Sequence, residues 1–224
     1  MKLLATIIII ATAALPASAR VISWFNAEGD VLAQSDATMI NATYTFEIGS
    51  FGSFTPLASN LSDWQANWKV FDRAVSGDGW NATTGYFTSS AEILASGLSS
   101  AGFDARPFST GETAFLWVYN SLDLLPSSEW ALVRDSSNVA LSPSWSIPVS
   151  DAGNPSSLDW DLLEADTAVW GGVNGARGGG SYDAIPGLTL SDVWLQTSPV
   201  PEPGSALLVL IATAACLRRR RAKS

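Results

Sequence analysis

Four carboxylates lie close together in the segment LDWDLLEAD. Asp159 and Asp161 alternate around a tryptophan, so on a β-strand they would share one face, about 6 to 7 Å apart. That separation is near the spacing of some glycosidase carboxylate pairs, which would cleave a sugar chain. Glu164 and Asp166 follow closely enough to offer a calcium site as a second interpretation. A third is that these side chains cap a short helical turn and stay solvated, since the ordered ligand pattern of a calcium loop is missing.

The residue types that serve most other enzymes are missing. The chain has no histidine, which removes the commonest general base and the commonest metal ligand. Its single cysteine, Cys216, lies in an apolar C-terminal run, which excludes Cys-His mechanisms and the usual zinc sites. Neither a phosphate-binding GxxxxGK nor a dinucleotide-binding GxGxxG pattern is present. We therefore expect no catalytic residue, metal or cofactor, and carboxylate chemistry is the one enzymatic alternative.

Tryptophan is frequent, with ten residues in 224. Indole rings can stack on sugar rings, but most of these tryptophans lie within apolar periodicities that predict a place in the core. Trp80 and Trp145 are flanked by Gly, Asn, Ser and Pro. We expect these two to be the exposed ones and the candidates for sugar contacts.

Short apolar or alternating runs predict the elements that would position these side chains. Gly, Pro, Asn, Asp and Ser separate the runs, as is typical of short strands joined by turns. The sequence therefore predicts a mainly β fold, an antiparallel β-sandwich or jelly-roll-like domain. The expected strands are residues 21–25, 43–48, 86–88, 114–119, 130–133, 167–170 and 191–195.

One segment, NLSDWQANWKVFDRAV, has a different periodicity. Its apolar residues recur at spacings of three and four, and an Asn or Ser is available as the N-cap. We predict one amphipathic helix over about residues 61–74, with Trp64, Trp68 and Phe71 packed against a sheet.

The N-terminus, MKLLATIIIIATAALPASAR, has the three regions of a secretory signal peptide in order. A lysine precedes an apolar stretch from Leu3 to Leu15, and a helix-breaking proline leads to the small residues Ala17 and Ala19. We expect cleavage after Ala19, so that residues 1–19 are the signal peptide and the rest is exported. Because the chain has one cysteine, no internal disulfide can form, and the exported domain must be held by its core.

The exported part is strongly acidic. Residues 20–199 contain six basic and twenty acidic residues, a net charge of −14. Such a surface disfavours nucleic acid as a partner, and we expect none. Residues 20–198 are long enough for one domain of ordinary size, and we expect a single β-rich domain.

The C-terminus, VPEPGSALLVLIATAACLRRRRAKS, places a Pro-Glu-Pro motif, an apolar run and four arginines in that order. The run from Ala206 to Leu217 has twelve residues and is about 18 Å long as a helix, against a hydrocarbon core of roughly 30 Å. Preceding residues can extend the helix and the arginine stems can reach the interface, so residues 199–224 can still anchor the chain, with the arginines cytoplasmic. The predicted anchor and stop-transfer residues are Ala206, Leu207, Leu208, Val209, Leu210, Ile211, Arg218, Arg219, Arg220 and Arg221.

This C-terminal arrangement resembles the PEP-CTERM sorting signal of bacterial envelope proteins. The motif residues are Val200, Pro201, Glu202, Pro203 and Gly204. The resemblance implies recognition by an exosortase, a membrane-embedded cysteine transpeptidase, which would cut near the motif and pass the protein to the cell surface or an extracellular polysaccharide matrix. The spacing of FEIGSFGSFTP, FLWVYN and AVWGG is also similar to that of small exported proteins with this signal, for which no activity is implied. A tail anchor that is never processed is the alternative.

These features predict an exported envelope or extracellular-matrix protein with a structural or adhesive domain, and not an enzyme. The expected partners are the processing exosortase, the membrane through the C-terminal helix, and an extracellular polysaccharide. The alternative function is a carbohydrate-binding module or a carboxylate-dependent carbohydrate-active enzyme. The enzyme would require Asp159 and Asp161 to line a cleft with aromatic walls.

Overall fold

The computed structural model describes residues 19–137, 144–149, 157–189 and 192–201. The described part is built mainly of short strands, which confirms the prediction of a mainly β fold. The strands are β1 (Arg20–Phe25), β2 (Val31–Ala33), β3 (Thr45–Ser50), β4 (Lys69–Ser76), β5 (Gly79–Asn81), β6 (Tyr86–Ile93), β7 (Ala114–Tyr119), β8 (Glu129–Arg134), β9 (Leu158–Asp161), β10 (Thr167–Trp170), β11 (Gly172–Val173), β12 (Ala176–Arg177), β13 (Trp194–Gln196) and β14 (Ser198–Pro199).

The strands form two sheets. The larger has the order β10-β8-β7-β3-β4-β5-β6-β1-β9, with β14 beside β8, and the smaller has the order β12-β11-β13-β2. Most neighbours are antiparallel, but the pairs β1–β9, β4–β5 and β13–β2 are parallel. The sheets are therefore mixed, whereas the sequence led us to expect antiparallel pairing.

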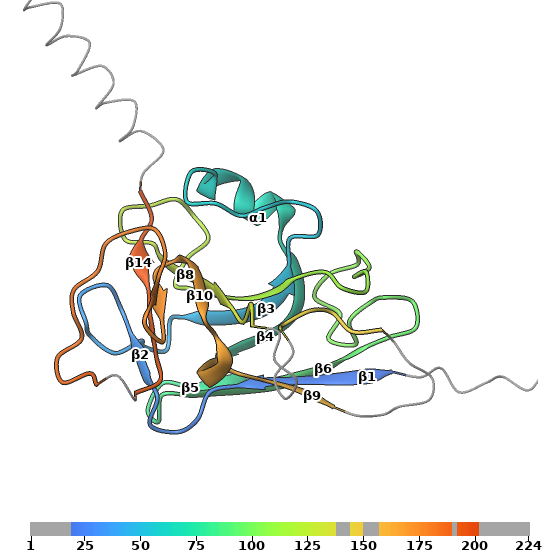
Figure 1. Cartoon of the computed structure of the whole chain (residues 1–224), viewed down its shortest axis with the longest axis horizontal. Helices are drawn as coiled ribbons and strands as arrows, with labels where there is room; N and C mark the ends of the chain where they lie inside the picture. The colour runs from blue at the N-terminus through green and yellow to red at the C-terminus, as the bar shows by residue number, and fades with distance from the viewer. Residues whose placement is uncertain (1–18, 138–143, 150–156, 190–191, 202–224) are drawn as a thin grey trace, which may run out of the picture.

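The larger sheet curls so that its two halves face each other across the main core. Figure 1 shows β1, β6 and β9 on one side and β3, β4 and β8 on the other. The ring of Phe46 on β3 stacks on Phe87 on β6, with centroids 4.7 Å apart, and lies 4.7 Å from Trp80 on β5. These contacts join strands that are not neighbours in the sheet, so aromatic packing closes the curl.

A second core, rich in tryptophan, lies on the opposite face of β3, β7 and β8. Trp117 on β7 has its ring centroid 5.0 Å from Trp130 on β8 and 5.8 Å from Trp64 of the helical segment. Alternate residues of β7 enter the two cores, and all six are buried. The continuous apolar run AFLWVY is thus a strand buried on both faces.

The helix predicted over residues 61–74 is wrong for most of its length. The structure has a 3₁₀ turn η1 (Leu61–Asp63), one turn of helix α1 (Trp64–Asn67), and then strand β4. Trp68 already has extended backbone, and beyond it Phe71 enters the main core while Val70 packs on the tryptophan-rich core. Because β4 is buried on both faces, its apolar residues imitate helical spacing. Trp64 and Trp68 do pack against the sheet as expected.

Candidate functional site

The first described strand begins at the predicted signal cleavage site. Ala19 is half-buried, and β1 starts at the next residue, Arg20. From Arg20 to Phe25 every residue of β1 pairs with β6. A cut after Ala19 would therefore leave the strand intact. Ala17 lies outside the described residues.

At the other end, the first residue of the Pro-Glu-Pro motif region belongs to the folded domain. β14 pairs with β8, and the backbone N–H of Val200 donates to the carbonyl of Ser128 at 2.9 Å. Val200 is only 2% exposed and packs in the tryptophan-rich core, whereas Pro201 is exposed. Val200, which the sequence analysis assigns to the sorting segment, thus packs with the described strands. The rest of the motif and the predicted anchor, residues 202–224, lie outside the described residues.

Glu129 on β8 fixes the segment that leads into the motif. Its carboxylate accepts hydrogen bonds from the hydroxyls of Thr197, Ser35 and Tyr44 and from the backbone N–H of Ser35. Burial raises the pKa of Tyr44, and the neighbouring Glu129 charge raises it further. One carboxylate therefore joins β8, the loop after β2 and the C-terminal segment.

The expectation that Trp80 and Trp145 are exposed is wrong. Trp80 is 3% and Trp145 is 2% exposed, and all ten tryptophans of the chain are buried. The Trp80 indole N–H donates to the carbonyl of Asn41, and the Trp145 ring stacks on Trp160 with centroids 6.1 Å apart. The tryptophans therefore offer no exposed row on which sugar rings could stack.

Two carboxylates of the opening segment, those of Asp161 and Asp166, accept backbone and hydroxyl hydrogen bonds. Asp159 is exposed on β9, and Asp161 accepts the backbone N–H of Leu163 at the start of the 3₁₀ turn η2 (Leu162–Glu164). Partial burial opposes ionisation of Asp166, but hydrogen bonds from Ser136 and Thr167 outweigh it and lower the pKa of Asp166.

Asp161 thus caps a short helical turn, which is the role that the third interpretation of this segment gives to its carboxylates. Within the described residues, acidic side chains form no group of three or more that could hold a metal ion. The same residues contain no helix long and apolar enough to cross a membrane.

Asp135, which follows β8, is a buried carboxylate of another kind. Asp135 is fully buried, and its Oδ2 atom has no hydrogen-bond partner among the described residues. Burial raises the pKa of Asp135, and the charges of Asp166 and Glu164 add to the effect. Asp135 lines neither of the two cavities described below.

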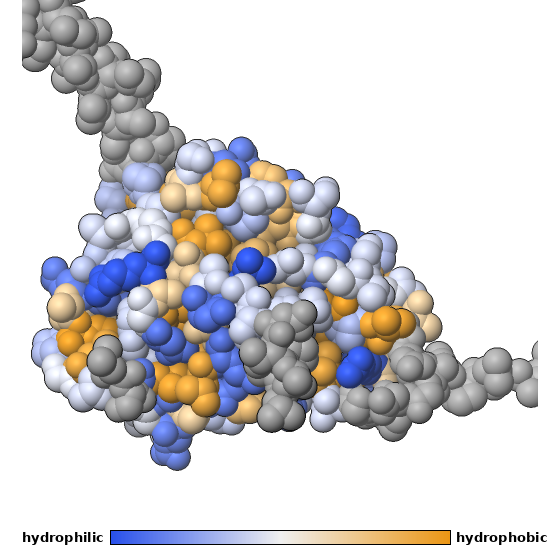
Figure 2. All heavy atoms as spheres, in the orientation of Figure 1, coloured by the Kyte–Doolittle hydropathy of each residue, from blue (hydrophilic) through white to orange (hydrophobic). Residues whose placement is uncertain are grey.

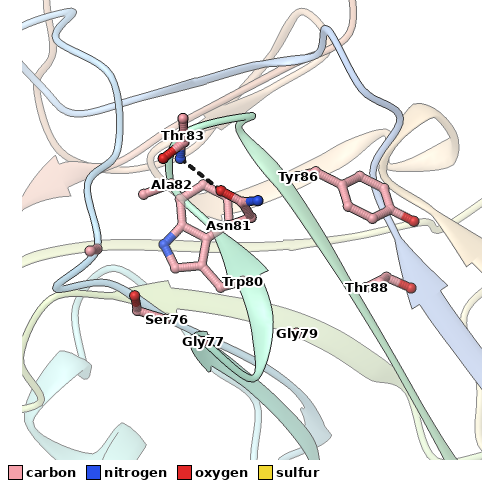
Figure 3. A pocket seen from close by; sticks show the side chains of 10 residues that line it. Ser76, Gly77, Gly79, Trp80, Asn81, Ala82, Thr83, Tyr86 and Thr88 are labelled. Carbon is pink, nitrogen blue, oxygen red and sulfur yellow. Dashed lines mark hydrogen bonds between the residues drawn. The ribbon is translucent and has the colours of Figure 1, made fainter.

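A cavity of about 490 Å³ lies beside β5 (Figure 3). Trp80 and Asn81 border it on β5, and Tyr86 and Thr88 border it on β6. Gly79 at its edge has φ +81°, and a Cβ there would lie 2.7 Å from the carbonyl of Thr88, so this close approach requires glycine. The lining is uncharged, and its polar groups are hydroxyls, an amide and backbone.

A second cavity, of about 280 Å³, lies between residues 51–56 and the ends of β7, β8 and β10; we call it the Arg134 cavity. Phe51 and Phe115 pack in its wall with centroids 5.6 Å apart, and Phe54 lies 5.8 Å from Phe51. The Arg134 guanidinium lies over the Phe115 ring, 5.7 Å from its centroid. The lining residues are Phe51, Gly52, Ser53, Phe54, Thr55, Pro56, Thr113, Phe115, Arg134, Thr167 and Val169.

Sequence reasoning did not find the Arg134 cavity. The sequence feature that could have indicated it is SFGSFTP, in which two aromatic residues lie among Gly, Ser and Thr. Arg134 belongs to no motif, and only strand pairing brings it to this segment. On the face seen in Figure 2, apolar and hydrophilic residues are interspersed, so hydropathy alone does not mark a site there.

Comparisons with models of protein families, with curated proteins and with solved structures found no match for this chain.

Proposed function

We propose that this protein is exported, held at the membrane by its C-terminal segment, and sorted to the cell surface or extracellular matrix by an exosortase. Its domain, a β-sandwich of jelly-roll-like type, serves there as a structural or adhesive component and not as an enzyme. The proposal rests on the order of the sequence signals and on the bounds of the fold between them.

The observation that carries the proposal is the position of β1 and of Val200 next to the two expected terminal segments. Strand β1 begins directly after Ala19, and near the other end the buried Val200 is followed by the exposed Pro201. Cuts after Ala19 and beyond Pro201 would each leave the described sheets intact. This supports removal of both terminal segments from a domain that stays folded.

The arrangement of the carboxylates favours a structural or adhesive role over catalysis. A glycosidase pair needs both groups in a cleft with room for the substrate. Asp161 instead accepts a backbone N–H, and neither Asp159 nor Asp161 lines the two cavities described above.

The test uses the full chain in a bacterial host with an exosortase. We expect the wild-type protein in the surface or culture fraction without Arg218–Arg221. In the triple variant Pro201→Ala, Glu202→Ala, Pro203→Ala, the uncut chain should accumulate in the membrane fraction. The exposed Glu28→Ala serves as the control and should behave like wild type. Release of the triple variant at the wild-type level would contradict the proposal.

A further inference from the structure

We propose that the Arg134 cavity binds a uronic acid residue, a sugar ring that carries one carboxylate. This deepens the proposed function and rests on it for the place where the ligand is met, because an adhesive matrix protein needs a site for its matrix.

The charge of the cavity is opposite to that of the domain. Among its eleven lining residues, Arg134 is charged and basic, and none is acidic. The exported part as a whole carries twenty acidic and six basic residues. At physiological salt, charges farther than about 8 Å away are largely screened, so nearby charges matter most. Arg134 is the one charged residue of the lining, and the Asp166 carboxylate, which binds the Thr167 hydroxyl, lies beside it.

The guanidinium of Arg134 is available for an anion. Lys69, Arg73 and Arg106 each form an ion pair with an acidic residue. Among the described residues, the Arg134 guanidinium forms no ion pair with a carboxylate. It makes a cation–π contact with the Phe115 ring. A guanidinium presents a planar fork of donors that matches the two oxygens of a carboxylate.

The other lining groups match a sugar ring. Ser53, Thr55 and Thr113 contribute hydroxyls to the lining, which can donate to and accept from sugar hydroxyls, whereas the Thr167 hydroxyl already donates to Asp166. The half-buried Phe54 forms the accessible apolar part of the wall, against which the C–H face of a sugar can pack, and the buried Phe51 and Phe115 lie behind it. At about 30 Å³ per water, the cavity holds roughly nine waters, which is room for one ring and not for a long chain segment.

The aromatic wall is preorganised. The Phe51 ring contacts Trp68 at 4.8 Å and Trp64 at 5.9 Å, measured between centroids, and Phe51 is 4% exposed. The Phe54 N–H donates to the Phe51 carbonyl at 3.0 Å, and the Gly52 N–H donates to the Ser50 hydroxyl. A wall held by the fold before binding reduces the ordering cost that a ligand must overcome.

The test is calorimetric titration of the full chain, solubilised in detergent, with glucuronate, its methyl ester and benzoate. We expect the ester, which lacks the charge, and benzoate, which lacks the hydroxyls, each to bind about tenfold more weakly than glucuronate. Arg134→Gln should weaken glucuronate binding about tenfold or more, since a hydrogen-bonded charge is lost. Arg177→Gln is the matched control, because Arg177 also lies over an aromatic ring, that of Tyr182, but outside the cavity, and should leave binding unchanged.

Three results would overturn the proposal: equal affinity for glucuronate and its ester, benzoate binding as tightly as glucuronate, or no glucuronate binding to the wild-type chain. If Arg134→Gln fails to fold, the comparison of acid and ester on the wild-type chain still decides. Sorting is measured separately by processing in cells. A chain that is sorted without binding glucuronate refutes the ligand alone, and a chain that binds glucuronate without being processed refutes the sorting alone.

Discussion

At the scale of single residues, several buried indoles have partners for their N–H groups, whereas the buried Trp117 N–H has none among the described residues. Trp24 donates to Asp72, Trp68 to Glu47 and Trp170 to the carbonyl of Ser198. A buried N–H without a partner costs free energy, so these acceptors allow tryptophan to serve as core. The polar neighbours of Trp80 belong to the short strand β5, and those of Trp145 to a segment outside the named strands. They do not report the direction of the side chain, which is why the exposure expected from sequence was wrong.

The environment of Tyr119 predicts that the folded protein loses stability at alkaline pH. Its hydroxyl donates to the buried Glu47 at 2.8 Å. Burial raises the pKa of Tyr119, and the Glu47 carboxylate raises it further, above the unfolded value of about 10. The protonated form is favoured in the fold, so this contribution to stability is present below pH 10 and is lost as the pH rises above it. The loss is up to about 1.4 kcal/mol per pH unit for one group.

We therefore expect the free energy of unfolding, measured in urea, to fall between pH 10 and 11.5. The decline should be shallower in Tyr119→Phe, because the hydroxyl that titrates is removed. Glu47 keeps its hydrogen bonds from Trp68 and Arg73 in this variant. The half-buried Tyr86→Phe is the control for loss of a hydroxyl. A slope in Tyr119→Phe as steep as in wild type would refute the assignment.

At the scale of elements, strand existence could be predicted better than strand partners. The runs at 114–119 and 167–170 match β7 and β10 in full, because apolar runs between turn residues are a local signal. The change from α1 to β4 could not be predicted from periodicity, since a strand buried on both faces lacks alternation. The segment is decided by tertiary contacts, with β3 pairing along most of β4.

Asn60 stabilises the short helical segment by binding the chain before it. Its side-chain oxygen accepts from the Leu57 backbone and from the Trp64 indole, both at 2.8 Å, and its amide donates to the Thr55 carbonyl. We expect Asn60→Ala to lower the free energy of unfolding by about 1 to 3 kcal/mol, since the Trp64 N–H loses its partner.

The control is Asn67→Ala in the same segment. Asn67 makes one exposed bond, to the Asp63 carbonyl, and its loss should cost less than about 0.5 kcal/mol. Urea denaturation of both variants checks the difference. Equal effects of the two substitutions would show that the Asn60 bonds do not stabilise the segment.

At the scale of the whole molecule, the cavities and the closure of the sheet come from pairings between distant parts of the chain. β1 pairs with β9 in parallel, and β2 pairs with β13. The Arg134 cavity likewise needs the segment 51–56, β7, β8 and β10 together. No local pattern encodes such register, so the sequence could predict strands but not the cavity. The buried Val200, directly before the exposed Pro201, was also beyond prediction from the motif.

The central claim is that both terminal segments are removed from a domain that stays folded. The most direct test is the intact mass of the protein recovered from surface and culture fractions of a bacterial host, with and without a working exosortase. We predict a species that starts at Arg20 in both strains and that lacks Arg218–Arg221 only when the exosortase is present. A membrane-bound species that keeps these arginines in both strains would contradict the account and identify a tail-anchored envelope protein.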